Sequence, residues 1–519
     1  MAISSTASVG ALVLFLQPSA LHAAKPAASA PFSFEVRLAP ALTNAPAAGR
    51  LFVILSRTNS PEPRLAVGRS GRDAPQSFAR DVHDFRPGAV VVIDKTAFGC
   101  PGANLAELPA GDYFLQALLA ANADLNFPNA PGNLYSEYRK LRIEPTRGRT
   151  VSLELTRQIP PEELPPDTGQ TRFVMLQSRL LSEFHHRPIY LRAGIILPRD
   201  YDRGPSRFYP LWIRIGGLNT RCTDISRLMA GNSDFRTIWQ AGTTPQFIVL
   251  QLDGAGPCGD PYYVNSANNG PYGDALVQEL VPYVEGKFRA TRSPGARVLS
   301  GVSTGGWVAL ALQIFYPDFF NGAWSSCPDP VDFRALELVN IYEDGNAYVN
   351  RFGNERPSER AANGDLVLTM RQEVGTENLL GRGDRYTMSG QQWGAWNAVF
   401  GPRGIDGSPL PLWDPQSGKI DHTVADQWRK YDLRAVLEAN WPTLGPKLKG
   451  KLHIAVGEAD QYFLNNAVHL LDEFLSQADP PFQGRIVYGA RQRHGWSDVD
   501  LTQMLNEMQT AISKAQSPR

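Results

Sequence analysis

One short stretch of this sequence has residue types and spacing that could do chemistry. Residues 301–305 read Gly-Val-Ser-Thr-Gly, the only G-x-S-x-G match in the chain, between an apolar run and an apolar segment over residues 307–316. In this pattern a serine stands on a tight strand-to-helix turn, and the two glycines let neighbouring backbone approach closely. In a chain with 46 glycines a chance match is the alternative. The strand-turn-helix context nevertheless favours Ser303 as an exposed nucleophile.

A nucleophilic serine needs a base that takes its proton and a carboxylate that orients the base. In enzymes with this turn, the acid and then the histidine follow later in the chain, each on a loop after a strand. Asp460 follows an expected strand over residues 452–456, and His494 follows one over residues 485–488. We therefore predict Asp460 as the acid and His494 as the base, with Glu458 as the alternative acid.

Negative charge that develops on an attacked carbonyl oxygen is stabilised by backbone N–H donors. Gly217 and Leu218 lie directly after an expected strand over residues 209–215, where a glycine turn can point its amides into a pocket. Thr304 opens the helix after the serine, so its N–H and the helix dipole lie beside the same point. We predict Gly217 or Leu218, together with Thr304, as the oxyanion donors. A plain glycine turn is the alternative.

The composition limits the kind of molecule this can be. A length of 519 residues suggests roughly two or three domains, and 43% hydrophobic with 20% charged residues is typical of a globular protein. The formal net charge is zero, so nothing indicates nucleic acid or an anionic membrane surface as a partner. The cysteines have no spacing typical of a zinc site. We therefore expect no metal and no cofactor.

The N-terminus has the pattern of a secretory signal. Residues 9–16 form an apolar core, and alanine-rich sequence around residues 23–24 offers a cleavage point. No Lys or Arg precedes the core, which is unusual for a signal peptide, and the segment is too short to span a bilayer. We expect a signal peptide and leader over residues 1–30, and a secreted or periplasmic protein without a membrane span.

Two regions with different patterns follow. Residues 31–157 contain short apolar runs bounded by turn residues, which predict a small all-β sandwich that packs or positions substrate. Residues 158–170 are proline-rich and predict a linker. Residues 171–519 alternate strand and helix patterns, which predict an α/β fold with a mostly parallel, doubly wound sheet. The expected strands cover residues 32–38, 51–55, 90–93, 113–118, 141–143 and 151–155, then 190–197, 209–215, 246–252, 322–326, 452–456 and 485–488.

The α/β alternation is interrupted over residues 330–445. This stretch is rich in Trp, Gly, Arg and Asp, and it has few clean periodicities. Because a structureless loop of this length is unusual in a compact domain, we expect a helical and irregular insertion. An insertion after the C-terminal end of a strand would overhang the site, which favours a cap or substrate wall over a peripheral ornament. Before it, a helix is expected over residues 274–289, kinked at Pro282.

These residues together resemble a known family. Residues from about 171 to 510 are similar to the esterase D / putative esterase family of α/β-hydrolases, which includes S-formylglutathione hydrolases, feruloyl esterases, enterochelin esterases and mycolyltransferases. The preceding β-sandwich is similar to the enterochelin-esterase arrangement. The likeness rests on residues 209–218, on residues 265–271 before a helix that carries Glu279, on residues 297–307 with 316–318, on residues 457–464, and on His494.

The resemblance implies an α/β-hydrolase with a large cap, acting as a serine carboxylic-ester hydrolase through a Ser303-His494-Asp460 triad and an acyl-enzyme. The substrate would be a small-molecule or polysaccharide-linked ester. There are two departures: Ile215 occupies a position where many members have a histidine, and the insertion is much longer than in the small esterases. An acyltransferase or serine peptidase on the same triad, or a non-catalytic carbohydrate-binding protein, are the alternatives.

Two cysteines lie near the predicted site. Cys222 follows the predicted oxyanion turn, and Cys258 follows the expected strand over residues 246–252. Neighbouring parallel strands would bring both loops to the same edge of the sheet. A disulfide between Cys222 and Cys258 is therefore one expectation for an exported chain, and two separate buried thiols are the other.

Overall fold

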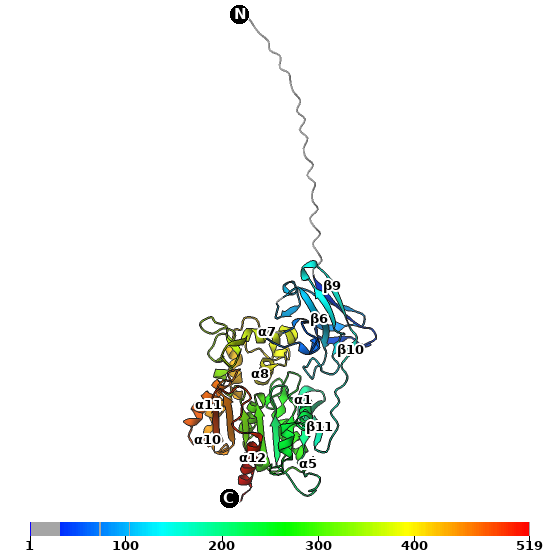
Figure 1. Cartoon of the computed structure of the whole chain (residues 1–519). Helices are drawn as coiled ribbons and strands as arrows, with labels where there is room; N and C mark the ends of the chain where they lie inside the picture. Colours follow the sequence, from blue (N-terminus) through cyan, green and yellow to red (C-terminus); the bar gives the residue numbers. More distant parts are fainter. Residues whose placement is uncertain (2–31, 72–73, 103, 518–519) are drawn as a thin grey trace.

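The computed structural model of the chain describes residues 1, 32–71, 74–102 and 104–517. The signal peptide expected within residues 1–30 therefore lies, apart from its first residue, outside the described residues. In the described part, no helix has the length and apolar character needed to cross a membrane. Figure 1 shows a β-rich N-terminal region at one end, the large α/β sheet at the other, and the helical insertion beside both.

The N-terminal region consists of two β-sheets that enclose a common apolar core. Its strands are β1 (Ser33–Leu38), β2 (Ala47–Ser56), β3 (Gln76–Phe85), β4 (Val90–Ile93), β5 (Phe98–Cys100), β6 (Gly111–Ala120), β7 (Leu134–Tyr135), β8 (Arg139–Ile143), β9 (Thr150–Leu155) and β10 (Arg157–Gln158). One sheet has the order β4-β1-β9, and the other has β10-β7-β6-β2-β3-β5, with β8 paired to β6. Phe34 of β1 and Leu115 of β6 are fully buried in the same core.

Two strands of this region show what the apolar pattern could predict. In β1 every second residue is buried, as the alternation of Phe34, Val36 and Leu38 predicts. β3 is missing from the expected strands because Arg80 and Asp81 interrupt its apolar pattern. It is nevertheless held in the sheet because it pairs with both β2 and β5. Backbone pairing therefore overrides a weak side-chain pattern here.

The C-terminal part is built on one large, mostly parallel sheet. Its strands are β11 (Thr171–Ser178), β12 (Ile189–Ile196), β13 (Leu211–Ile215), β14 (Ile248–Leu252), β17 (Arg297–Val302), β18 (Ala323–Ser326), β21 (Leu452–Gly457) and β22 (Arg485–Gly489). They lie in the order β11-β12-β14-β13-β17-β18-β21-β22. The two pairings of β12, with β11 and with β14, are antiparallel, and the other pairings in this sheet are parallel. The expected α/β-hydrolase type of sheet is thereby confirmed.

Helices cover both faces of this sheet. They are α1 (Arg179–His185), α2 (Ile225–Leu228), α3 (Asp234–Gln240), α4 (Tyr272–Ala275), α5 (Val281–Lys287), α6 (Thr304–Phe315), α10 (Leu433–Lys447), α11 (Asn465–Ser476) and α12 (Leu501–Gln516). Trp212 and Ile213, adjacent on β13, belong to different apolar clusters: Trp212 packs with α3 and α12, and Ile213 with α6. Because adjacent strand residues point to opposite faces, both faces are buried.

The helix expected over residues 274–289 forms as three consecutive segments, with Pro282 near the start of the last one. A π-helical segment, Leu276–Leu280, joins α4 to α5 and ends just before this proline. Pro282 has no N–H to donate, so the wider π turn accommodates the missing hydrogen bond. A short strand pair, β15 (Asn265–Ser266) and β16 (Gly270–Pro271), precedes α4.

Before α10, the described part of the insertion contains a hairpin and three α-helices. These are β19 (Pro357–Arg360), β20 (Leu366–Thr369), α7 (Met370–Leu380), α8 (Gln392–Phe400) and α9 (His422–Trp428). Trp393, Trp413 and Trp428 are almost completely buried and belong to the same apolar cluster as the large sheet. The insertion is thus packed onto the α/β core and shares it.

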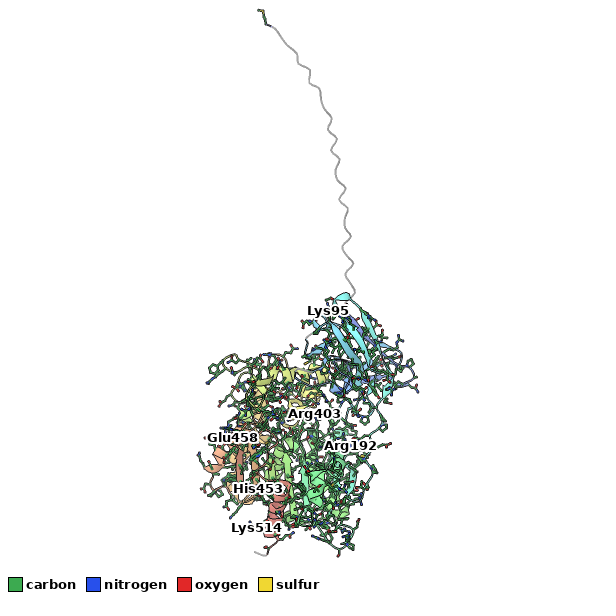
Figure 2. All side chains as sticks on the ribbon, in the orientation of Figure 1. Lys95, Arg192, Arg403, His453, Glu458 and Lys514 are labelled. Carbon is green, nitrogen blue, oxygen red and sulfur yellow. The ribbon has the colours of Figure 1, made fainter. Side chains whose placement is uncertain are left out.

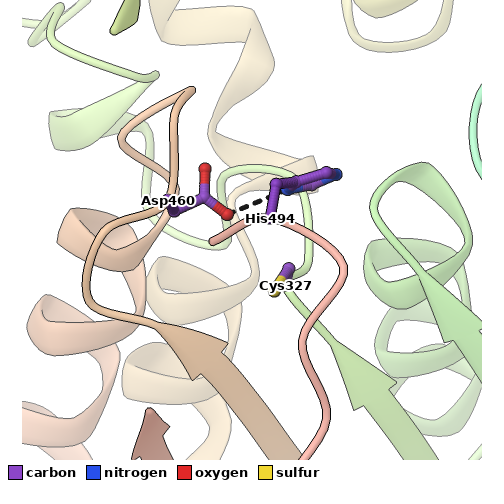
Figure 3. Close-up of side chains that lie close together, drawn as sticks. All are labelled: Cys327, Asp460 and His494. Carbon is purple, nitrogen blue, oxygen red and sulfur yellow. Dashed lines mark hydrogen bonds and ion pairs between the residues drawn. The ribbon is translucent and has the colours of Figure 1, made fainter. Parts of the chain in front are cut away.

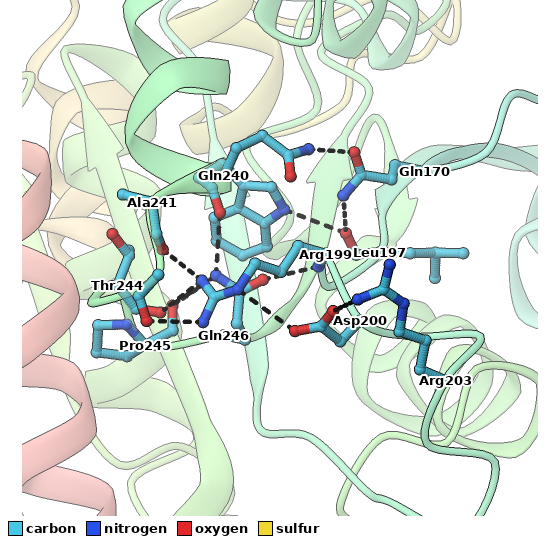
Figure 4. A network of polar contacts seen from close by, with 12 residues as sticks. Gln170, Leu197, Arg199, Asp200, Arg203, Gln240, Ala241, Thr244, Pro245 and Gln246 are labelled. Carbon is cyan, nitrogen blue, oxygen red and sulfur yellow. Dashed lines mark hydrogen bonds and ion pairs between the residues drawn. The ribbon is translucent and has the colours of Figure 1, made fainter.

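Arg199 lies at the end of the sheet opposite the C-termini of its parallel strands. There it makes a network of polar contacts, which Figure 4 shows. Its guanidinium donates to the carbonyl oxygens of Ala241 (2.5 Å) and Thr244 (3.2 Å). Its backbone N–H donates to the Gln246 side-chain oxygen at 2.8 Å. These bonds hold the segment between α3 and β14 against the end of β12.

Arg50 of β2 makes several of the polar contacts that join the N-terminal region to the insertion. Arg50 of β2 is only 1% exposed. Its guanidinium donates to the carbonyls of Asn378 (3.3 Å) and Leu379 (2.6 Å) at the end of α7. It also pairs with Asp81 at 3.0 Å and with Asp384 at 2.6 Å. Because a cation at a helix C-terminus satisfies free carbonyls and the helix dipole, Arg50 fixes α7 on the β region.

We expect Arg50→Met to lower the free energy of unfolding by about 3 kcal/mol, because it leaves Asp81 and the α7 carbonyls without their buried partner. Arg86→Met is the matched control: Arg86 pairs with Asp84 on the surface and is 72% exposed, so its loss should cost less than about 1 kcal/mol. Urea unfolding followed by tryptophan fluorescence measures both. Equal effects of the two changes would contradict the anchoring role.

Candidate active site

Ser303 stands on the turn between β17 and α6, at φ 59° and ψ −127°. This backbone conformation is strained for a residue with a side chain, so the surroundings must hold it. The Ser303 N–H donates to the Ser326 carbonyl at 3.0 Å, and the Ser303 carbonyl accepts from the N–H groups of Gly306 (2.8 Å) and Trp307 (3.1 Å). The strand-turn-helix geometry expected of the G-x-S-x-G pattern is present.

The two glycines of the pattern are required by backbone contact. A Cβ atom on Gly301 would lie 2.0 Å from the Gly305 carbonyl oxygen. A Cβ atom on Gly305 would lie 2.4 Å from the carbonyl oxygens of both Ile215 and Gly216. Such distances exclude any side chain. The close approach predicted from the sequence therefore brings the end of β13 against the serine turn.

His494 and Asp460 form a hydrogen-bonded pair, as Figure 3 shows. The distance between His494 Nδ1 and Asp460 Oδ2 is 2.8 Å, and the Asp460 side chain has no exposed surface. The Tyr462 N–H donates to Asp460 Oδ1 at 2.9 Å, and the Tyr462 ring packs edge-on against the imidazole. With its Nδ1 bonded to Asp460, the imidazole keeps Nε2 as its second functional nitrogen.

Glu458, the alternative acid, is engaged elsewhere. Its Oε2 lies 3.1 Å from His469 Nε2 and accepts from the Asn465 side chain at 3.5 Å. Both partners belong to α11, and Figure 2 labels Glu458 on that side of the molecule. Of the two candidate acids, the structure therefore brings Asp460 to His494.

Cys327 lies beside the same pair. In the described chain, Cys327, Asp460 and His494 are the one set of three potential metal-ligand atoms within 4.8 Å of one another. Burial raises the pKa of the Cys327 thiol, and the thiol donates toward the Trp496 carbonyl at 3.4 Å. In this structure the thiol contacts a backbone carbonyl, while the histidine and the carboxylate bond to each other.

A cavity of about 350 Å³ opens beside Ser303. Ser303, His494 and Leu218 all line it. Gly217 lies next to the serine, because a Cβ atom there would be 3.7 Å from the Ser303 Cβ. Thr304 is the first residue of α6, where N–H groups have no acceptor within the helix. The predicted nucleophile, the predicted base and one candidate oxyanion donor, Leu218, thus share one cavity, and Gly217 lies beside the serine.

Three parts of the chain contribute to the wall of this cavity. The N-terminal region supplies Gly68 and Ser70. The insertion supplies the largest share: Glu337, Glu373, Thr376, Glu377, Gln391, Gln392 and Trp396. The turns and loops after the strands of the large sheet supply the other lining residues, including the serine and the histidine. The insertion carries Trp393, Trp396, Trp413 and Trp428, all of which are almost completely buried in the core. Of these four, Trp396 alone also lines the cavity.

Asp329 is a site residue that the sequence patterns missed. Its Oδ1 accepts from the Ser303 hydroxyl at 3.4 Å, so the serine is hydrogen-bonded to Asp329 in this structure. Burial raises the pKa of this carboxyl. Asp329 follows β18, and its place after an expected strand is the signal that could have revealed it. Its Oδ2 accepts from the Tyr262 hydroxyl (2.5 Å), the Thr304 hydroxyl (3.0 Å), the Trp396 indole (3.1 Å) and the Gln392 amide (3.2 Å).

The disulfide expected between Cys222 and Cys258 is absent, since both cysteines are free. The Cys222 backbone N–H donates to Asp253 at 3.1 Å, and burial raises the pKa of its thiol. Cys258 instead lines a separate cavity with Phe127 of the N-terminal region. Burial raises the pKa of Cys258 to about 11. The two loops leave the same end of the sheet, but the two thiols lie in different surroundings. Cys222 is buried, and Cys258 lines the separate cavity.

Comparison with known proteins now defines the class. A family model described as "Putative esterase" matches residues 191–496, which include all the predicted site residues. No curated protein matches the chain. Solved structures with a similar fold include the fluorophosphonate-binding serine hydrolase F of Staphylococcus aureus, with 15% identity, TM-score 0.39, 67% of this chain and 99% of that chain. A ferulic acid esterase of Anaeromyces mucronatus has 12% identity, TM-score 0.32, and coverage of 67% and 93%.

The fold and the serine turn define an α/β-hydrolase, and the family match extends over more than half of the sequence. The chain therefore belongs to the putative esterase family, as the sequence resemblance predicts. As a member it is a serine carboxylic ester hydrolase.

We expect Gly305→Ala to destabilise the protein by about 3 kcal/mol, because a methyl group there would overlap two carbonyl oxygens of the β13 loop. Gly286→Ala is the matched control: Gly286 is exposed on α5, and the nearest atom to its Cβ position lies at 3.5 Å. That change should stabilise slightly, since alanine is the better helix former. Thermal and urea unfolding would decide, and an unperturbed Gly305→Ala variant would contradict the close contact.

Proposed function

We propose that Ser303, His494 and Asp460 form a catalytic triad that hydrolyses carboxylic esters through an acyl-enzyme. The observation that carries this proposal is the 2.8 Å bond between His494 and Asp460 at a cavity that Ser303 also lines. The strained turn at Ser303 supports a nucleophilic role, since strain of this kind persists where function requires it. The family match supports the ester as the substrate class.

In the first half of the reaction, the Ser303 Oγ attacks the ester carbonyl carbon while its proton passes to His494 Nε2. Before substrate binds, the Ser303 hydroxyl is bonded to Asp329, so attack requires a rotation of the serine side chain towards the histidine. Asp460 holds the Nδ1 proton and stabilises the imidazolium. Collapse of the tetrahedral intermediate expels the alcohol, which takes the proton from Nε2.

In the second half, water gives a proton to His494 Nε2 and attacks the acyl carbon, and the Ser303 oxygen leaves with that proton. Both tetrahedral intermediates carry negative charge on the former carbonyl oxygen. We assign its stabilisation to the N–H groups of Thr304 and of Gly217 or Leu218. The support for this assignment is the contact between Gly217 and Ser303 and the position of Thr304 at the helix N-terminus.

We also propose the division of the chain into a β-sandwich at 31–157, a linker at 158–170 and a hydrolase domain at 171–519, with a cap at 330–445. The cap assignment is supported by the insertion residues in the cavity wall. α10 lies at the end of this range. It packs on α6 and α11, so it belongs with the helices that cover the sheet. Export to the periplasm or the medium, with a small-molecule or polysaccharide-linked ester as substrate, completes the proposal.

Ser303→Ala should lower kcat/KM for p-nitrophenyl esters by at least about 10⁴-fold, because triad members act as a unit. The fold should persist, since alanine removes only an oxygen atom. Ester kinetics with circular dichroism as the control for folding measure this. Hydrolysis at the wild-type rate by this variant would remove the nucleophile assignment.

Asp460→Asn should lower kcat by about 10⁴-fold, because an amide at this position favours the wrong imidazole tautomer. Glu458→Gln is the matched control two residues away, and it should keep nearly full activity because Glu458 contacts α11 and not His494. Steady-state kinetics of both variants on one ester provide the comparison. A reversed order would make Glu458 the orienting acid.

A further inference from the structure

Acidic side chains are concentrated in the wall of the cavity beside Ser303. Asp329, Glu337, Glu373 and Glu377 all line it, and its lining includes no lysine or arginine. Glu373 and Glu377 are one turn apart on α7, so they share a helix face. None of the four acids forms an ion pair with any residue that the structure describes. The catalytic roles proposed above use none of these carboxyl groups as acid or base.

Glu337 has the least satisfied carboxyl group of the four. It is 3% exposed, its φ is 53°, and its Oε2 has no hydrogen-bond partner in the described structure. A buried polar oxygen without a donor is costly, so its retention points to a group that the protein itself does not supply.

The other three carboxyl groups are held in place by neutral donors. Glu377 accepts from the N–H groups of Trp393 and Gly394, both at 2.9 Å. The Ser358 hydroxyl donates to Glu373. Asp329 accepts from the hydroxyl, indole and amide donors described above. These bonds fix the oxygens around the cavity but supply no counterion.

The carboxyl groups are too dispersed to enclose a metal ion. In the described part of the chain, the one set of three potential ligand atoms within 4.8 Å contains none of these four residues. A cavity of about 350 Å³ suits a group of several heavy atoms. The Trp396 and Tyr462 rings also line it, and aromatic rings beside carboxylates favour organic ammonium groups.

We propose that this cavity binds an organic ammonium group carried by the ester substrate. The inference rests on the proposed function, because it assumes that Ser303 attacks the ester bound there. The carboxyl groups of Glu337 and Glu373 would face the cation, and Trp396 would contact it through its ring. The enzyme would thereby select cationic esters over neutral esters of the same shape.

Proton release provides an independent signature. Burial without a countercharge raises the pKa of Glu377 to about 8 and that of Glu337 well above its usual range. These shifts favour the protonated carboxyl groups as long as no countercharge is bound. A bound cation lowers these pKa values, so binding releases protons. The charged groups that act on Glu337 are Glu373, Asp329, Asp460 and Glu377, with His494 acting on Asp329.

The test uses esters that differ only in charge. One pair is butyrylcholine and its neutral isostere, in which a tert-butyl group replaces the trimethylammonium group. A second pair places the same two groups on the acyl side of an ethyl ester. Calorimetric titration into the Ser303→Ala variant, in two buffers of different ionisation enthalpy, measures affinity and proton release without turnover.

We expect the cationic member of at least one pair to bind at least about tenfold more tightly than its isostere, with net proton release. Equal affinities in both pairs, or no measurable binding of either cationic ester, would overturn the ammonium site. Turnover by the wild-type enzyme separates the two proposals. Hydrolysis of neutral esters without a preference for cationic ones would contradict this inference alone. Selective binding of the cationic ester without any hydrolysis would contradict only the proposed function.

Two variants localise the effect. Glu337→Gln should abolish most of the preference for the cationic ester in kcat/KM. Glu373→Gln, which keeps an acceptor for Ser358, should reduce the preference about threefold or more and serves if the buried Glu337 change impairs folding. Glu343→Gln is the matched control, because Glu343 is exposed on the same insertion. Unchanged preference in both cavity variants would overturn the proposal.

Discussion

The site depends on a contact between backbone atoms at which no side chain fits. Gly305 lies against the carbonyls of Ile215 and Gly216, and Gly301 lies against Gly305. This close packing holds Ser303 in its strained conformation, because relaxing the turn would open the contact between two central strands. The same contact brings Gly217 beside the serine. Nucleophile and oxyanion donors are therefore positioned by one packing constraint.

The acidic face of the cavity depends on a second, longer chain of contacts. α7 carries Glu373 and Glu377, and the carbonyls at its C-terminus are bound by Arg50 of the N-terminal region. The other end of α7 is capped by Thr369, whose side chain accepts from the Gln372 N–H. The β region thus contributes to the site in two ways, through Gly68 and Ser70 in the wall and through the placement of α7.

The sequence could predict those parts of the site that follow from local pattern. Ser303, Asp460 and His494 each come directly after a strand that its own apolar residues reveal, so their common edge follows from a parallel sheet. Asp329 has the same kind of position, but nothing local separates it from other loop acids. Glu337 and Glu377 could not be predicted, because their burial depends on how an insertion without clear periodicity packs. The expectation of a disulfide between Cys222 and Cys258 was wrong for a related reason. Strand order determines which loops are neighbours, but it does not determine where a thiol points.

The acidic residues around Ser303 differ in their hydrogen-bond partners, and this difference distinguishes their roles. Asp460 has a histidine on one oxygen and a backbone N–H on the other, so its position is fixed for orienting a base. Asp329 and Glu377 accept hydrogen bonds from neutral donors, which fix their positions but supply no countercharge. Glu337 retains a free buried oxygen. Because burial makes an unmet acceptor costly, the least satisfied acid is the one whose energy a bound ligand changes most.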